Sequence, residues 1–143
     1  MDDDYADVTA LGHQLLRLQR RRTVAFAGST LEISAFRILW VLSDGEPRTL
    51  RQIGTDLDLE QSTVNRQVNA AIAAGYLERF DVPGQASKMV RPTERGRELY
   101  DNDGRVRAAR YQQAIDTVGV DRARRLIDDL RAFNDAFDAA LEE

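Results

Sequence analysis

Apolar residues recur at helical spacing on both sides of a short turn in the middle of the chain. Leu50, Ile53 and Leu57 are three and four residues apart, which predicts one buried helix face. Thr49 and Gln52 have the spacing of a capping box that starts this helix. A second set with helical spacing follows the turn: Val64, Val68, Ala71 and Ile72. The pattern therefore predicts two helices that meet at the turn, which is a helix-turn-helix.

The second predicted helix is polar on its other face, where side chains three and four residues apart lie together. Asn and Gln can form two hydrogen bonds with adenine, Arg can do so with guanine, and Ser or Thr can contact bases or phosphates. An ordinary solvated helix face has similar polarity and is the alternative. The predicted DNA-contacting residues of this helix are Gln61, Ser62, Thr63, Asn65, Arg66 and Asn69.

A hairpin and a long helix are predicted next. Gly75 is placed to end the second helix, as a C-terminal glycine commonly does. Residues 76–82 and 89–92 are interpreted as strands, and the Pro-Gly pair between them is a turn signal. Thr93 is the predicted N-cap of a new helix. This order of elements is that of a winged helix-turn-helix, so the predicted fold is mostly α with a small β-hairpin wing (α+β).

Four stretches carry a family resemblance. They are LEISAFRILWVL (31–42), TDLDLEQSTVNRQV (55–68), GYLER (75–79) and PTERG (92–96), and together they resemble the MarR family of bacterial transcriptional regulators. The resemblance implies a single domain in which a DNA-binding lobe, residues 31–92, is flanked by a helical dimerisation lobe. It also implies a homodimer that binds an inverted-repeat operator in double-stranded DNA, represses transcription and is released by a small ligand. The dimerisation lobe would comprise residues 5–26 and 93–142.

Two departures from the family pattern affect the predicted DNA contacts. Glu60 replaces the serine that usually caps the recognition helix, so capping is expected to be weaker or shifted to Asp58. The wing of this family usually holds an Asp-Arg-Arg cluster, but Gly84, Gln85 and Ala86 stand there. Because an arginine is favoured in a narrow minor groove, we expect a weaker or differently placed wing contact. Its predicted residues are Gln85, Ser87 and Lys88.

The charge distribution favours the middle of the chain as the DNA-reading segment. The 143 residues carry a net charge of −4, yet residues 46–97 hold eight cations and seven anions. Residues 98–143 hold seven cations and eleven anions. Phosphate contacts supply most non-specific affinity, so we expect modest non-specific binding. Arg48, Thr49 and Arg51, at the start of the first helix of the motif, are predicted phosphate contacts.

Apolar stripes mark helices at both ends of the chain. A long helix is expected from Thr93 to about residue 118, with Gly104 as a possible kink and Gly119 as its end. By resemblance, the terminal helices intertwine with those of a second subunit, whereas intrachain packing would produce the same periodicity. The N-terminal stripe contains Tyr5, Val8, Leu11, Leu15 and Leu18. The C-terminal stripe contains Ala123, Leu126, Ile127, Leu130, Phe133, Phe137 and Leu141.

The resemblance further implies a crevice for a small aromatic or anionic effector. His13 and Arg17 are four residues apart on one predicted helix face, and a carboxylate or phenolate could bind there. The alternative assigns Phe36 and Trp40 to the core, Arg37 to a structural ion pair and His13 to the surface or an interface. The candidate ligand-binding residues are His13, Arg17, Phe36, Arg37 and Trp40.

Composition excludes several other classes. The chain has no cysteine, which excludes disulfides and thiol redox sensing, and its one histidine makes a His-rich metal site improbable. We expect no cofactor, no metal and no enzyme activity, because no catalytic triad or phosphate-binding loop stands out. No stretch is apolar and long enough to span a membrane, so a soluble cytoplasmic protein is expected. The alternative function is a winged-helix module for protein contacts without specific DNA binding.

Overall fold

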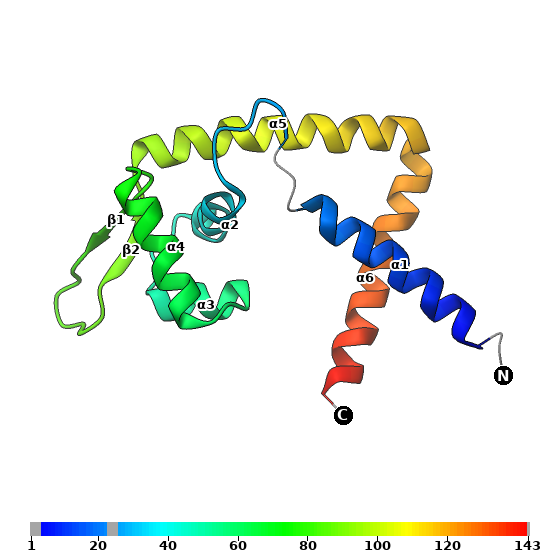
Figure 1. Cartoon of the computed structure of the whole chain (residues 1–143), viewed down its shortest axis with the longest axis horizontal. Helices are drawn as coiled ribbons and strands as arrows, with labels where there is room; N and C mark the ends of the chain where they lie inside the picture. Colours follow the sequence, from blue (N-terminus) through cyan, green and yellow to red (C-terminus); the bar gives the residue numbers. More distant parts are fainter. Residues whose placement is uncertain (1–3, 23–25, 143) are drawn as a thin grey trace. The chain divides into compact units, whose positions relative to one another are not determined.

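The computed structural model describes residues 4–22 and 26–142, and Figure 1 traces them from blue to red. This described part contains six α-helices, one 3-10 helix and one two-stranded antiparallel sheet, which confirms the predicted fold class. The elements are α1 (Asp4–Arg22), α2 (Ile33–Val41), η1 (Leu42–Asp44), α3 (Leu50–Leu57), α4 (Gln61–Ala73), β1 (Leu77–Phe80), β2 (Met89–Pro92), α5 (Glu94–Val118) and α6 (Val120–Leu141).

The turn between α3 and α4 forms as the sequence predicts at its start. The Thr49 hydroxyl accepts a hydrogen bond from the Gln52 amide nitrogen at 3.2 Å, and the Gln52 side chain accepts one from Thr49 N at 2.9 Å. This reciprocal pair is the predicted capping box. Asp58 ends α3 in a left-handed conformation, φ 52°, and Glu60 precedes α4 without a side-chain cap. The N-terminus of α4 is thus capped more weakly than it would be by a serine side chain, and Asp58 does not serve as its N-cap.

The hydrophobic core of the winged helix lies among α2, α3, α4 and the hairpin, which gather together in Figure 1. Both predicted apolar stripes face it: Ile53 and Val68 are completely buried. Gly54 lets the two helices approach closely, because a Cβ at this position would lie 3.3 Å from Val64 Cγ2. The buried apolar residues of this core are Leu31, Ala35, Ile38, Leu39, Leu42, Ile53, Leu57, Val64, Val68, Ala71, Leu77 and Val90.

The hairpin forms the predicted wing, with a shorter first strand. Leu77 pairs with Pro92 and Phe80 pairs with Met89, so the two strands are antiparallel and in register. An additional bridge joins the backbone of Arg48 to that of Val90 through hydrogen bonds of 2.8 and 3.1 Å. Arg48, which precedes the N-cap residue of α3, therefore adds one bridge to the sheet and attaches the helix-turn-helix to the wing.

A close backbone contact links the end of α4 to the start of α5. Thr93 N donates to Tyr76 O at 3.0 Å, and the Thr93 hydroxyl donates to Gly75 O at 2.6 Å. The same hydroxyl accepts a hydrogen bond from Gly96 N at 3.1 Å, which makes Thr93 the predicted N-cap of α5. A Cβ added at Gly96 would collide with the carbonyl oxygen of Tyr76, so only glycine fits there without displacement.

Helix α5 continues through Gly104, so the possible kink at this residue does not end the helix. It ends before Gly119, whose φ of 93° suits glycine. The chain divides into two compact units, Met1–Gly104 and Arg105–Glu143. The proposed dimerisation range 5–26 includes residues 23–25, which lie outside the described residues.

The apolar stripes of α1 and α6 are largely exposed in the single chain. Ala123 is buried, but Leu126, Ile127 and Phe137 each keep more than half of their surface accessible. In α1, Tyr5 is 73% exposed and Leu15 is 40% exposed. Along the described helices, none combines the length and apolar composition that a bilayer crossing requires.

Candidate nucleic-acid interface

Helix α4 presents an exposed polar face opposite its buried stripe. Gln61, Ser62, Asn65, Arg66 and Asn69 are all exposed, whereas Thr63 is half-buried. Gln61 Nε2 donates to Asn65 Oδ1 at 2.9 Å, so these two amides are paired one turn apart. Arg66 forms no hydrogen bond or ion pair with any other described residue, which leaves its guanidinium available for an external acceptor.

Asn69, at the other end of this face, is held by the wing. Arg79 Nη2, from β1, donates to Asn69 Oδ1 at 2.7 Å, and both side chains are exposed. Sequence reasoning did not include Arg79 among the candidate residues. Neither its type nor its spacing distinguishes it from an ordinary exposed strand residue, because the contact joins residues ten positions apart across a turn.

The two arginines that were predicted to contact phosphates near the start of α3 differ in their surroundings. Arg51 is exposed, and Thr49 uses its hydroxyl in the capping box. Arg48 instead donates from Nη2 to Asp44 Oδ2 at 2.6 Å and from Nη1 to Val41 O at 2.6 Å, and its Nε forms an ion pair with Asp56 Oδ2 at 3.0 Å. All three of its guanidinium nitrogen atoms have partners within the fold, so Arg48 acts here as a structural residue.

The Arg48 cluster also sets the acidity of its partner. The hydrogen bonds from the Arg48 guanidinium, followed by the one from the Glu46 backbone, lower the pKa of Asp44 from 3.8 to about 2. The same pair raises the pKa of Arg48 above its usual value. Both charges are retained at neutral pH.

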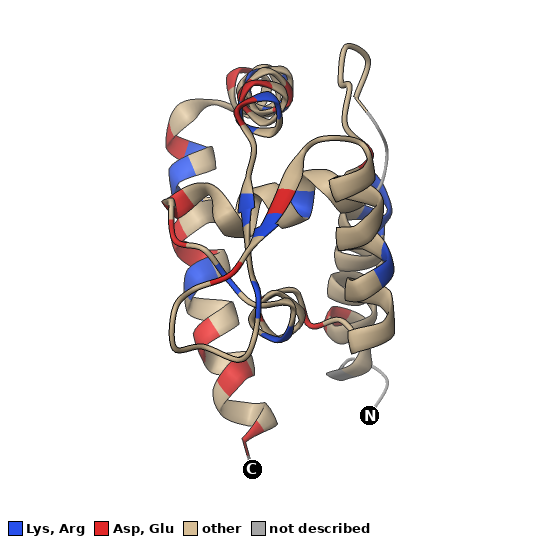
Figure 2. Cartoon of the chain, turned by 90° about the vertical axis from the view of Figure 1, so that its left-hand side faces the viewer, with Lys and Arg blue, Asp and Glu red and all other residues tan. Residues whose placement is uncertain are grey.

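The wing exposes the three residues that the sequence predicted, Gln85, Ser87 and Lys88. Gly84 adopts φ 82°, and Gln85 N donates to Val82 O at 3.1 Å, which closes the loop. Figure 2 shows Lys and Arg positions interspersed with Asp and Glu positions along the ribbon of the hairpin.

The one arginine of β2 is engaged within the wing. The Nε of Arg91 donates to Glu78 Oε1 at 2.7 Å, and its guanidinium carbon lies 4.1 Å from the centre of the Phe80 ring. These contacts cross from one strand to the other, so Arg91 stabilises the hairpin.

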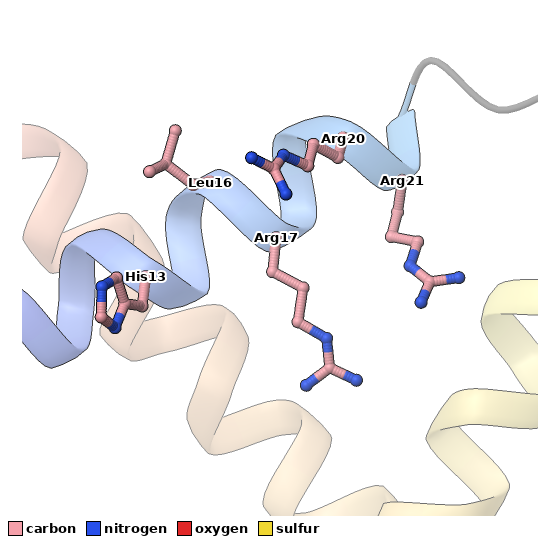
Figure 3. A pocket seen from close by; sticks show the side chains of 5 residues that line it. All are labelled: His13, Leu16, Arg17, Arg20 and Arg21. Atoms are coloured by element: carbon pink, nitrogen blue, oxygen red, sulfur yellow. The ribbon is translucent and has the colours of Figure 1, made fainter.

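The predicted ligand-binding residues lie in two separate places. His13 and Arg17 line an open hollow along α1 with Leu16, Arg20 and Arg21 (Figure 3). Figure 3 shows Arg17 and Arg21 extending from the same side of the helix. None of the residues that line this hollow comes from α2.

The three α2 candidates differ in their surroundings. Phe36 packs on Tyr100 with ring centres 5.0 Å apart, as a core residue would. Arg37 is exposed, and Trp40 is 59% exposed. The alternative that placed Trp40 in the core is therefore wrong, because Ile38 and Leu39 occupy the buried face of this short helix. The effector role of these five residues stays a prediction.

A buried carboxylate that the sequence did not single out holds the approach to α2. Asp103, on α5, is 1% exposed and accepts hydrogen bonds from Thr30 N at 2.9 Å and Leu31 N at 2.7 Å. Asn102 Nδ2 adds a third at 3.2 Å. The carboxylate thus fixes the segment that enters the winged helix against α5.

The described side chains also include no group of three or more His, Cys, Asp or Glu residues arranged to hold a metal ion. The exposed polar face of α4, the capped start of α3 and the short wing together form the candidate surface for nucleic-acid recognition.

Comparison with known families identifies this arrangement. Residues 29–86 match the family model of the MarR family. The chain carries a MarR-family winged helix. The resemblance drawn from the sequence is thereby confirmed, and the matched segment includes α2, α3, α4, β1 and residues 81–86 of the wing loop. A comparison with curated proteins finds no match.

Solved structures with the same fold extend the likeness to MarR-type terminal helices. The crystal structure of MarR family transcription regulator SP03579 has a TM-score of 0.83 at 20% identity, covering 99% of this chain and 95% of that one. The transcriptional repressor CouR, bound to a 23-mer DNA duplex, has a TM-score of 0.77 at 22% identity, covering 90% and 95%. PcaV from Streptomyces coelicolor, in complex with its natural ligand, has a TM-score of 0.69 at 22% identity, covering 87% and 92%.

Proposed function

We propose that this chain is a sequence-specific transcriptional regulator that binds double-stranded DNA in the cytoplasm. The observation that supports this most directly is the exposed polar face of α4 within a MarR-family winged helix, with Arg66 unengaged by other described residues. Donor and acceptor groups on a recognition helix suit the major groove, where each base pair presents a distinct pattern. The transcriptional repressor CouR, which shares the fold, is bound to a DNA duplex.

The proposed contacts follow the geometry of the exposed residues. Arg66 and Asn65 would reach base edges, while Ser62 and Arg51 would contact phosphates and set the register. Gln85, Ser87 and Lys88 would make the wing contact. Arg48 is left out of the proposed contacts, because its guanidinium nitrogen atoms already bind Asp44, Asp56 and backbone oxygens.

The regulator is proposed to act as a homodimer through its terminal helices. The exposed apolar stripes of α1 and α6 support this, because large apolar side chains in a contiguous row mark an interaction surface. A two-fold dimer places two recognition helices about one DNA turn apart, roughly 34–36 Å, so the operator would be an inverted repeat.

Repression relieved by a small effector is the regulatory part of the proposal. PcaV, with the same fold, is in complex with its natural ligand. In this chain an aromatic or anionic effector would contact residues from the set His13, Arg17, Phe36, Arg37 and Trp40. Binding would favour a dimer whose reading helices are wrongly spaced for the operator.

Selection of binding sites from random duplex DNA at two salt concentrations tests the DNA-binding proposal. We expect an inverted repeat with half-sites one helical turn apart, and affinity that falls as salt rises. Enrichment of a single asymmetric half-site would contradict the dimeric arrangement. Absence of salt-dependent binding would favour the alternative, a winged-helix module for protein contacts.

Replacement of Arg66 by alanine tests the proposed reading face. Specific binding should weaken by about 1–3 kcal/mol if Arg66 reads a guanine. The matched control is Arg125→Ala, which removes an exposed arginine of α6 on the side away from its apolar stripe. In titrations against the selected operator, equal losses for the two variants would remove Arg66 from the recognition residues.

A further inference from the structure

The contact between Arg79 and Asn69 fixes the orientation of one amide on the reading face. An arginine side chain has only donors, so its partner atom on Asn69 must be the carbonyl oxygen, Oδ1, as the 2.7 Å hydrogen bond shows. The amide nitrogen, Nδ2, is then left with both of its N–H groups for an external partner. The Gln61–Asn65 pair lacks this constraint, because either amide can donate to the other.

An asparagine whose amide oxygen is already hydrogen-bonded within the protein should prefer different bases from one whose amide is unbound. A free asparagine pairs with adenine by donating to N7 and accepting from N6, which requires both amide atoms. The hydrogen bond from Arg79 uses one of the two lone pairs of Oδ1, and the guanidinium charge beside it disfavours a second donor such as adenine N6. Guanine presents two acceptors, N7 and O6, which suit an amide that offers only N–H groups. The guanidinium charge beside the amide adds to this preference for acceptor edges.

We propose that the Arg79–Asn69 pair makes Asn69 a donor-only reader that selects guanine over adenine at one base pair of each half-site. Arg79 is a positioning residue in this proposal, and Asn69 is the group that contacts the base. The inference rests on the proposed DNA-binding function and deepens it, because it states the base class that one position of the operator must contain.

Base-preference profiles of the full-length protein and three variants test the pair. The wild type should favour guanine over adenine at the Asn69 position by on the order of tenfold. Arg79→Met keeps a side chain of similar length but cannot donate, so its preference at the same base pair should shift toward adenine by a similar factor. Arg79→Lys can still donate to Oδ1 and should retain the guanine preference. Asn69→Ala should lose discrimination at that base pair alone.

A purely structural or phosphate-binding role for Arg79 predicts a different outcome. Arg79→Met would then weaken binding equally for all sequences and reduce the salt dependence by about one phosphate contact, with no change in base preference. That result would overturn the proposal. An unchanged preference in Asn69→Ala would also overturn it, since the amide would then read no base.

A measurement on the free protein separates this inference from the DNA-binding proposal. In nuclear magnetic resonance spectra, the side-chain amide signals of Asn69, assigned by their loss in Asn69→Ala, should move in Arg79→Met and stay near their wild-type positions in Arg79→Lys. Unmoved signals in Arg79→Met would overturn the pair even if operator binding is found. If the signals move but no DNA sequence is enriched by the wild type, the proposed function fails instead.

Discussion

The guanidinium of Arg48 joins three parts of the winged helix. It bonds to Asp44 at the end of η1, to Asp56 on α3 and to the carbonyl oxygen of Val41 at the end of α2. Its backbone pairs with Val90 on β2. A single residue thus connects the helix-turn-helix, the preceding helix and the wing, so its partners determine how firmly the wing is attached.

The Asp44–Arg48 pair should make stability depend on pH in the acid range. The pKa of Asp44 is lowered to about 2 in the folded protein, from 3.8. A carboxylate with a lowered folded pKa contributes stability above its unfolded pKa and loses this contribution as pH falls through the folded value. The difference in unfolding free energy between wild type and Asp44→Asn should therefore be constant above about pH 5 and shrink between about pH 4 and pH 2.

Urea titrations of both proteins across that pH range measure this difference, and other titrating groups cancel in it. High salt should reduce it as well, because Asp44 is exposed and its charge is screened. A difference that stays constant down to pH 2 would mean that Asp44 is not held by Arg48 in solution.

The buried carboxylate of Asp103 should matter more for stability than exposed acids on the same helix. In Asp103→Asn, one of the two backbone N–H groups of Thr30 and Leu31 faces an amide NH2 instead of an acceptor. Leaving a buried donor unsatisfied costs about 1–3 kcal/mol. The control, Asp101→Asn, makes the same chemical change at an exposed position of α5 and should stay within about 0.5 kcal/mol. Equal effects in chemical denaturation would show that the Asp103 contacts contribute little.

Individual contacts were the part of the site that the sequence predicted least. Exposure of the polar row on α4 followed from its helical period, because burial of Val64 and Val68 turns the opposite face outward. The roles of Arg48 and Arg79 did not follow, since they depend on partners brought close by turns and strand pairing. Asp103 contacts residues more than seventy positions away, and no local pattern contains that information.

At the scale of elements, the junction between the hairpin and α5 depends on one glycine. A Cβ at Gly96 would collide with Tyr76 O, whereas a Cβ at Gly104, in the interior of the same helix, would meet no atom within 4 Å. Gly96→Ala should therefore destabilise the fold by about 1–3 kcal/mol through overpacking. Gly104→Ala should stabilise it by about 0.4–1 kcal/mol by restricting the unfolded chain.

Thermal or urea unfolding of the two glycine variants compares them directly, since the chemical change is identical. The decisive result is the sign of each change relative to the wild type. A Gly96→Ala variant as stable as the wild type or more stable would show that the backbone of Tyr76 moves away easily, and that the junction is less closely packed than the contact with Gly96 indicates.

The elements themselves were mostly predictable because several local signals agreed. The capping box at Thr49 marks the start of α3, and Gly75 follows the end of α4. The apolar period of the two helices agrees with these boundaries. Arg48 forms an isolated bridge to β2. A single bridging residue creates no alternating pattern in the sequence, so Arg48 was not predicted as part of the sheet. Helix α5 continues through Gly104, because a helix tolerates a single glycine in its interior.

At the scale of the whole molecule, the proposed dimer can be tested by placing a charge on the apolar stripe of α6. Phe133→Asp should produce a monomer with much weaker operator binding, because an unpaired charge in an apolar interface is costly. Ala132→Asp adds the same charge to the neighbouring, exposed position on the opposite face of α6 and should leave the dimer intact.

Analytical ultracentrifugation and operator titration of the two α6 variants provide the measurements. A dimeric Phe133→Asp protein would place the interface elsewhere. Stripes predict that a surface is apolar, but they do not reveal whether the same chain or another copy covers it. Leu126, Ile127 and Phe137 are exposed in the single chain, which favours cover by a second copy. The sequence alone did not distinguish this from packing within one chain.

The uncovered apolar rows of α1 and α6 have a consequence for dilute solutions. When association hides surface that a lone chain leaves in water, mass action couples folding to the amount of protein present. The melting temperature of such a protein rises with its own concentration. If the proposed dimer forms, a cell that makes little of this protein would hold it as a less stable species, so the synthesis rate would influence its lifetime.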